Sequence, residues 1–251
     1  MAFSAKTVLI TGATDGIGLA LARIYRAQGA RPVLVGRRSL SDLHPDFFTP
    51  QTYCRADLSG DDCVDEIERF LQAQEIEGID LLIQNAGTGY YGPVKEQTRA
   101  SIRQVLAVNL TTPILLSHRL YPYLEQTGGK MVLIGSVASA IACPDYAVYA
   151  ATKAALEALG RSLRAELKGR VRVQVVHPGA TRTGLHAKIG LTRDRVDWER
   201  FSPAERVASK IARAIAGRRP VVTVGAGNRL LRFAGRLLGG AVDGVMRSTS
   251  R

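Results

Sequence analysis

Residues 6–18 read KTVLITGATDGIG, a short apolar run that leads into a turn with three glycines. Residues 19–28 continue with apolar side chains at helical spacing, and the pattern stops at Gly29. A strand, a glycine turn and a helix in this order form a phosphate site, because glycines let the backbone approach a pyrophosphate and the helix N-terminus offers free N–H groups. The spacing is GxxxGxG rather than the commoner GxGxxG, and a glycine pattern alone is weak evidence. Its position between a strand and a helix is what indicates a phosphate site. We expect residues 11–18 to bind a dinucleotide.

The second expected strand, residues 31–35, is followed by Gly36, Arg37 and Arg38. In dinucleotide folds an acid at this strand end binds the ribose 2′-hydroxyl of NAD. Glycine stands there in this chain, and two arginines follow that can hold a 2′-phosphate through paired N–H groups. This favours NADP(H) over NAD(H), although a solvated charged turn is the alternative. Asp15 acts against it, because a carboxylate in the glycine turn repels a phosphate.

Short apolar runs recur along the chain and alternate with helical patterns. A long helical stretch, residues 98–124, is interrupted by Asn109 and Pro113. Strands that are short and apolar on both faces, with helices between them, predict an α/β fold: a Rossmann-type doubly wound parallel sheet of about seven strands with helices on both faces. No repeat or linker divides the chain, so we expect a single domain of residues 1–251. The expected later strands are residues 52–56, 79–83, 130–135, 171–176 and 220–224.

Residues 136–153 read SVASAIACPDYAVYAATK and directly follow an expected buried strand. Tyr149 and Lys153 are four apart, so on a helix they share one face, and Ser136 ends the strand. An ammonium near a phenol favours the phenolate and lowers its pKa, while a serine hydroxyl can bind a carbonyl oxygen. The alternative is an amphipathic helix face with a serine cap.

Composition limits the function classes. With 46% hydrophobic and 22% charged residues the chain is typical of a soluble globular protein, and no apolar run approaches the ~20 residues of a membrane span. The N-terminus is unlike a signal peptide, so we expect a cytoplasmic protein. The net charge of +12 is compatible with binding to nucleic acid, to an anionic membrane or to an anionic ligand. Nucleic acid is the weakest of these, because the chain has no lysine-rich run with interleaved aromatic residues. Three cysteines and four scattered histidines lack metal-ligand spacing, so no metal site is expected.

Taken together, the motifs resemble the short-chain dehydrogenase/reductase family, in its single-domain subgroup of about 250 residues. They occur in the family's order and spacing and cover roughly residues 6–225. The motifs are TGATDGIG (residues 11–18), Asp57-Leu58, NAG (85–87), Asn109, Ser136, YAATK (149–153) and PGATRT (178–183).

The resemblance implies four catalytic residues. Tyr149 would donate or accept the substrate proton, and Lys153 would lower the tyrosine pKa and hold the nicotinamide ribose. Ser136 would orient the substrate oxygen, and Asn109 would hold a water in a proton relay through Lys153. Tyr146 and Cys143 are expected to line the substrate site.

The resemblance also implies a cofactor site. A basic residue at Arg37 is usual in members that prefer NADP(H), whereas the basic residue often found at Asp15 is missing. The expected cofactor-binding residues are Gly12, Thr14, Asp15, Gly16, Ile17, Gly18, Arg37, Arg38, Asp57, Leu58, Asn85, Ala86, Gly87, Tyr149, Lys153, Pro178, Gly179, Thr181 and Thr183.

Two stretches follow the family pattern loosely. Residues 184–201 occupy the place of the substrate lid, and a capping box with proline at the first helical position, residues 202–205, starts a helix after it. Residues 228–251 form a basic amphipathic extension, in which an apolar stripe runs beside Arg229, Arg232 and Arg236. This stripe can pack on a partner subunit, on its own subunit or, as a peripheral contact, on an anionic membrane.

The resemblance thus implies an NADP(H)-dependent oxidoreductase that interconverts a ketone or aldehyde and an alcohol, with Tyr149 as acid and base. A membrane contact through residues 228–251 would favour a lipophilic substrate. An NADP(H)-binding sensor without turnover is the alternative. By analogy with the family, a homodimer or homotetramer is expected.

Overall fold

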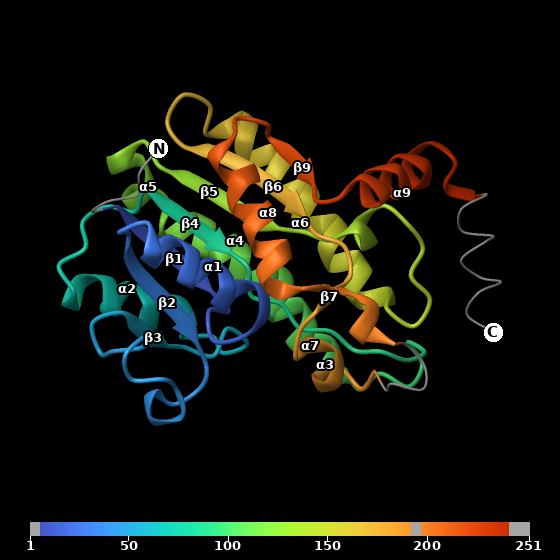
Figure 1. Ribbon diagram of the computed structural model, residues 1–251, viewed down its shortest axis with the longest axis horizontal. Coiled ribbons are helices and arrows are strands. Elements are labelled where there is room, and N and C mark those ends of the chain that lie inside the picture. The colour runs from blue at the N-terminus through green and yellow to red at the C-terminus, as the bar shows by residue number, and fades with distance from the viewer. Residues whose placement is uncertain (1–5, 192–196, 241–251) are drawn as a thin grey trace.

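The computed structural model describes residues 6–191 and 197–240 (Figure 1). Within them a seven-stranded parallel sheet has the order β3-β2-β1-β4-β5-β6-β9. This confirms the predicted doubly wound α/β fold, and the strands fall where the apolar runs predict them. Their bounds are β1 (Thr7–Thr11), β2 (Arg31–Gly36), β3 (Tyr53–Arg55), β4 (Leu81–Gln84), β5 (Lys130–Ile134), β6 (Arg172–His177) and β9 (Val221–Thr223).

Side chains alternate between two apolar layers, because successive residues of a strand point to opposite faces. Val8 and Ile10 of β1 join a cluster with α1 (Gly16–Ala27) and α8 (Ala204–Ala216). Leu9 joins the opposite cluster, which contains residues of α2 (Cys63–Ala73), α4 (Thr112–Arg119) and α6 (Ala147–Glu166). Figure 1 shows α1 and α8 side by side on one face of the sheet.

The predicted helical stretch 98–124 is several helices in succession. It comprises α3 (Arg99–Leu106), a π-helical turn (Ala107–Thr111) that contains Asn109, α4 with Pro113 in its first turn, and α5 (Tyr121–Thr127). The two interruptions therefore lie where the sequence places them. A π-turn inside a helix is frequent at functional sites.

The carboxyl ends of β1 and β4 are held together where the strand order changes direction. Thr11 Oγ1 accepts hydrogen bonds from the backbone N–H groups of Asn85 and Ala86, both at 3.0 Å. Asn85 Nδ2 donates to the Thr11 carbonyl at 2.9 Å. Such a switch point is where open α/β sheets bind ligands.

The expected lid is anchored at both ends. Thr181–Arg182 (β7) pairs with Ser202–Pro203 (β8), and α7 (Leu185–Lys188) lies between them. Residues 192–196 of the lid lie outside the described residues. The predicted capping box is wrong: α8 begins at Ala204 after Pro203, with no side-chain cap, because Ser202 lies in the bridge opposite Thr181.

The C-terminal extension forms α9 (Ala226–Leu237), which Figure 1 shows at the end of the molecule beyond β9. Residues 241–251 of the predicted extension lie outside the described residues. Leu230, Phe233 and Leu237 are 63–69% exposed, whereas Arg232 is 3% exposed. The helix therefore buries Arg232 against the protein, whereas Arg229 and the apolar side chains of Leu230, Phe233 and Leu237 are exposed. No helix in the described part of the chain has the length and hydropathy to cross a bilayer.

Candidate active site

A cavity of about 810 Å³ lies at the carboxyl ends of the parallel strands and extends under the lid. Most of the predicted site residues meet there, although they come from segments far apart in the sequence. Those that line the cavity are Gly12, Thr14, Asp15, Gly16, Ile17, Arg37, Asp57, Leu58, Asn85, Ala86, Gly87, Ser136, Tyr149, Lys153, Pro178, Gly179, Thr181 and Thr183. Gly18, Arg38 and Asn109 are predicted site residues that do not line it.

The glycine turn is shaped by close approach of backbone segments. Gly12 has φ +67°, and a Cβ there would lie 2.9 Å from the Ala86 Cα. A Cβ on Gly18 would lie 2.1 Å from the Gly12 carbonyl oxygen. Gly18 therefore has a packing role, because it lets α1 approach the backbone of the glycine turn. The floor of the cavity is formed by backbone without side chains, as at sites that bind phosphates.

The two arginines after β2 differ in their surroundings. Arg37 lines the cavity near Asp57, whose pKa is held below its usual value mainly by hydrogen bonds from Ser59 and further by Arg37. Arg38 does not line the cavity, and its Nη2 donates a hydrogen bond to the Asp42 carbonyl. Of these two arginines, Arg37 is therefore the one that can contact a phosphate in the cavity.

Asp15 makes two contacts in the glycine turn. Its Oδ1 accepts from the Gly16 N–H at 2.7 Å and so caps α1. Its Oδ2 lies 2.6 Å from Lys188 Nζ, at the end of α7 in the lid. The basic residue missing from the glycine turn is thus matched by a lysine from the lid, which offsets the negative charge of Asp15.

Ser136, Tyr149 and Lys153 come together at the end of β5 and the first two turns of α6. Ser136 and Tyr149 both line the cavity, and the Ser136 hydroxyl acts to lower the pKa of the Tyr149 phenol. Lys153 Nζ lies 5.7 Å from the Tyr149 ring centroid and donates to the Ile134 carbonyl at 3.1 Å. A hydroxyl, a phenol and an ammonium in one cavity can bind an oxygen atom and exchange a proton with it.

The electrostatics correct one expectation. Burial raises the pKa of the Tyr149 phenol, while its hydrogen bond with Ser136 acts in the opposite direction. Burial also lowers the pKa of Lys153 to about 8. The sequence predicts a phenol pKa lowered by Lys153; in the structure desolvation outweighs any such effect, and the lysine donates to a backbone carbonyl.

Asn109 supports the site from behind. Its Oδ1 accepts from the Thr88 N–H and its Nδ2 donates to the Thr88 carbonyl, both at 2.8 Å. Nδ2 also lies 3.2 Å from Thr152 Oγ1, which donates to the Tyr149 carbonyl at 2.7 Å. The side chain thus ties the loop after β4 to α6.

The rest of the cavity is formed largely by residues that the motifs do not identify. Tyr146 and Cys143 line it as predicted. The α3 residues Ser101 and Gln104 also line it; no local signal marks them, because only the packing of α3 brings them there. The apolar and aromatic members of this wall are Tyr90, Val108, Tyr146, Leu185, Ile189, Leu191 and Phe201.

Comparison with known proteins agrees with this geometry. The family described as short chain dehydrogenase matches residues 6–194. The uncharacterized oxidoreductase YbbO of Escherichia coli is 32% identical over 224 residues, which are 86% of this chain and 83% of that protein. The 11-beta-hydroxysteroid dehydrogenase-like 4A of Arabidopsis thaliana is 30% identical over 84% of this chain and 72% of its own. A short-chain dehydrogenase of Sphingobium yanoikuyae, solved with NADPH, superposes with a TM-score of 0.79 at 28% identity, covering 96% of this chain and 95% of its own. The chain belongs to the short-chain dehydrogenase/reductase family, whose members are oxidoreductases that bind a nicotinamide dinucleotide.

Proposed function

We propose that the protein is an NADP(H)-dependent oxidoreductase that interconverts a ketone or aldehyde and an alcohol. The observation that carries the proposal is that Ser136, Tyr149 and Lys153 line one cavity, with Lys153 Nζ 5.7 Å from the centroid of the Tyr149 ring. A protein that only senses the dinucleotide has no need of this arrangement.

The three side chains divide the work on the substrate oxygen. Bound NADPH would supply the hydride that reaches the carbonyl carbon. Ser136 donates a hydrogen bond to the carbonyl oxygen, and Tyr149 transfers its phenolic proton to the same oxygen, which completes the alcohol. The Lys153 ammonium stabilises the phenolate that remains until solvent returns the proton. In the reverse direction the phenolate takes the proton from the alcohol.

The cofactor preference rests on the end of β2. Gly36 leaves no carboxylate there, and a Cβ at this position would lie 2.7 Å from Thr14 Cγ2. Arg37 lines the cavity and can bind a 2′-phosphate, while Lys188 offsets the charge of Asp15. These residues fit NADP(H), and the NADPH bound by the Sphingobium relative supports the same choice.

The substrate is proposed to be lipophilic. Apart from the motif residues, the cavity is lined mostly by apolar and aromatic side chains, with Ser101 and Gln104 of α3 among its polar members. A wall of this kind favours a hydrophobic carbonyl compound over a small polar one. The steroid-dehydrogenase-like name of the Arabidopsis relative points in the same direction.

Titration of the purified protein with NADPH and NADH, followed by nicotinamide fluorescence, tests the cofactor. We expect much tighter binding of NADPH, and then NADPH oxidation at 340 nm in a screen of ketones from small polar to long-chain and polycyclic. Equal or tighter binding of NADH would contradict the preference. NADPH binding without turnover across the screen would favour the sensor.

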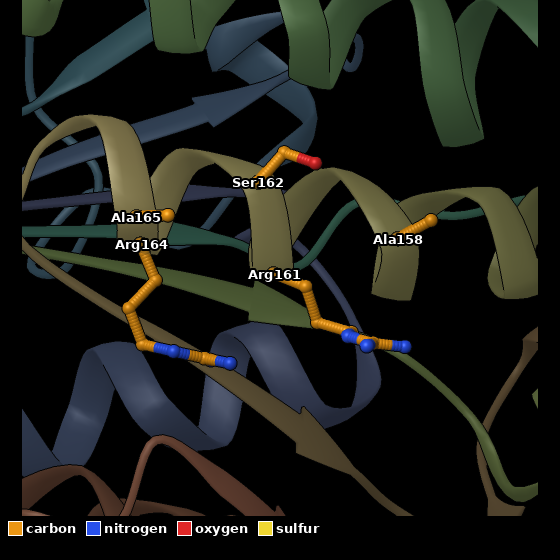
Figure 2. A pocket seen from close by; sticks show the side chains of 5 residues that line it. All are labelled: Ala158, Arg161, Ser162, Arg164 and Ala165. Atoms are coloured by element: carbon orange, nitrogen blue, oxygen red, sulfur yellow. The ribbon is translucent and has the colours of Figure 1, made fainter.

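Self-association is proposed through the outer side of α6 and the adjoining α3–α4 surface. Leu106, Ile114 and Leu115 are 39–42% exposed there. A shallow cavity of about 630 Å³ lies on α6, and Figure 2 shows Arg161 and Arg164 extending to one side of this helix. Light scattering after gel filtration should show a dimer or tetramer that Leu115→Arg disrupts; a monomeric wild type would contradict this.

The outer side of α9 is a second apolar surface. Leu230, Phe233, Leu237 and Leu238 are exposed, but Arg232 and Arg236 are bound to Glu157, which leaves less of their charge for lipid headgroups. We therefore place protein contact ahead of a peripheral membrane contact, in an otherwise cytoplasmic protein. Co-sedimentation with vesicles of phosphatidylserine and phosphatidylcholine that is lost in Phe233→Ser would reverse this order.

A further inference from the structure

A buried arginine from the C-terminal helix lies directly behind the catalytic serine. Arg232 of α9 is 3% exposed. Its Nη1 donates to the Ser136 carbonyl oxygen at 3.1 Å and to Ser139 Oγ at 2.6 Å. Its Nη2 donates to both carboxylate oxygens of Glu157, at 3.1 and 3.0 Å. One guanidinium thus connects two segments of the active site.

Glu157 belongs to the helix that carries the other catalytic residues. It lies four residues after Lys153 and eight after Tyr149 on α6, so the three are on neighbouring turns of one helix face. Arg236, one turn further along α9 than Arg232, also donates to Glu157. The carboxylate of α6 is therefore held by two arginines of α9.

The Ser136 carbonyl is held by more than one donor. Besides Arg232, Ser139 Oγ donates to it at 2.9 Å, and His177 Nδ1 lies 3.1 Å from it. Ser139 Oγ also lies 2.9 Å from Glu157 Oε2. The Ser136 carbonyl is therefore bound by Ser139, by His177 of β6 and by Arg232 of α9, and Glu157 of α6 contacts it only through Ser139 and Arg232. These contacts fix the backbone that carries the Ser136 hydroxyl.

The backbone of α9 packs against the same segment. A Cβ on Gly235 would lie 2.0 Å from the Ala140 carbonyl oxygen, in the loop between Ser136 and Tyr149. This close contact and the two arginines hold α9 against the active-site loop. Because buried ion pairs resist separation once formed, we expect α9 to stay docked.

We propose that Arg232 is a positioning residue for the reaction: it fixes the Ser136 backbone relative to α6 and thereby holds the Ser136 hydroxyl against the Tyr149 phenol. This inference rests on the proposed function of Ser136 and Tyr149. It makes α9 a working part of the active site, although the helix contributes no residue to the cavity wall.

The test compares Arg232→Met with Arg232→Lys and a matched control, Arg229→Met, on the full chain. Arg229 is an exposed arginine on the same helix with no side-chain hydrogen bond among the described residues. We expect Arg232→Met to lower kcat by ~10- to 100-fold, with NADPH affinity unchanged. Arg232→Lys, which keeps a donor for the Ser136 carbonyl, should recover part of the loss, and Arg229→Met should retain wild-type kcat.

Two outcomes would overturn the inference. One is a kcat for folded Arg232→Met equal to that of Arg229→Met. The other is an equal loss of kcat and of NADPH affinity, which indicates general damage. If Arg232→Met does not fold by circular dichroism, the comparison of Arg232→Lys with the control decides.

A second readout separates this inference from the proposed function. The tyrosinate absorbance of each protein, minus that of the same protein with Tyr149→Phe, follows the titration of Tyr149 alone. Suppose that wild type binds NADPH but turns over no ketone, so that the proposed function fails. If Tyr149 then titrates at a higher pH in Arg232→Met than in wild type, the inference about Arg232 still holds. An unmoved titration would overturn the inference as well.

Discussion

Lys188 Nζ lies 2.6 Å from Asp15 Oδ2, so an ion pair joins the lid to the glycine turn at the candidate cofactor site. Without the lysine, the Asp15 carboxylate would face a bound phosphate uncompensated. Lys188→Met should therefore raise the Kd for NADPH about threefold to tenfold, a modest change because both side chains are about half exposed. Arg182→Met is the control, since it breaks a lid ion pair of 2.8 Å with Glu199 that does not line the cavity. Equal effects of the two changes, measured by fluorescence titration, would contradict a role for Lys188.

The neighbouring arginines give a matched pair for the cofactor preference. Arg37→Ala should raise the Kd for NADPH by ~10- to 100-fold and leave that for NADH unchanged, because charge-assisted hydrogen bonds to a phosphate contribute about 1.5–3 kcal/mol. Arg38→Ala should change neither, since its guanidinium is bound to the Asp42 carbonyl. If Arg38→Ala raised the Kd for NADPH more than Arg37→Ala does, Arg37 would not be the residue that binds the 2′-phosphate.

The pH profile should show the state of Lys153. Burial lowers its pKa to about 8, so the ammonium is present below that pH and is lost above it. Because the reduction needs a charged Lys153 and a protonated Tyr149, kcat/KM for the ketone should fall as pH rises through about 8. A profile that stays flat to pH 10, measured with saturating NADPH, would show that the lysine charge is not required.

The docking of α9 is tested by two glycines of that helix. A Cβ on Gly235 would meet the Ala140 carbonyl oxygen, whereas a Cβ on Gly227 has nothing within 4 Å. Gly235→Ala should lower the free energy of unfolding by about 1–3 kcal/mol through overpacking and reduce kcat. Gly227→Ala should be neutral or stabilise by up to about 1 kcal/mol, because alanine favours helix. Urea unfolding measures both, and equal stability of the two variants would show that α9 does not pack as described.

Local sequence is enough for the sheet and for most of the site. Strands such as residues 31–35 and 130–135 are apolar on both faces, which only a buried parallel strand requires, and Asn109 and Pro113 mark the interruptions after α3. Family motifs bring Ser136, Tyr149 and Lys153 together because the end of β5 and the start of α6 are fixed by the fold. These are features that neighbouring residues determine.

The remaining features depend on contacts between distant segments. Ser202 does not cap α8 because it pairs with Thr181, and no local pattern contains that pairing. The sequence places Arg229, Arg232 and Arg236 beside an apolar stripe without saying what they contact, and only the structure shows Arg232 buried against Glu157, 75 residues earlier in the chain. The spacing of Tyr149 and Lys153 likewise does not determine the phenol pKa, because desolvation depends on every group that surrounds the phenol.

Turnover by Tyr149→Phe tests the central claim most directly. The change removes only the phenolic oxygen, so the cavity keeps its shape and NADPH should bind within about twofold of wild type. Loss of the proton donor should lower kcat for ketone reduction by ~10²- to 10⁴-fold, and Ser136→Ala should also abolish turnover. A Tyr149→Phe protein that keeps a tenth or more of wild-type kcat would show that this phenol is not the acid, and the proposed mechanism would be wrong.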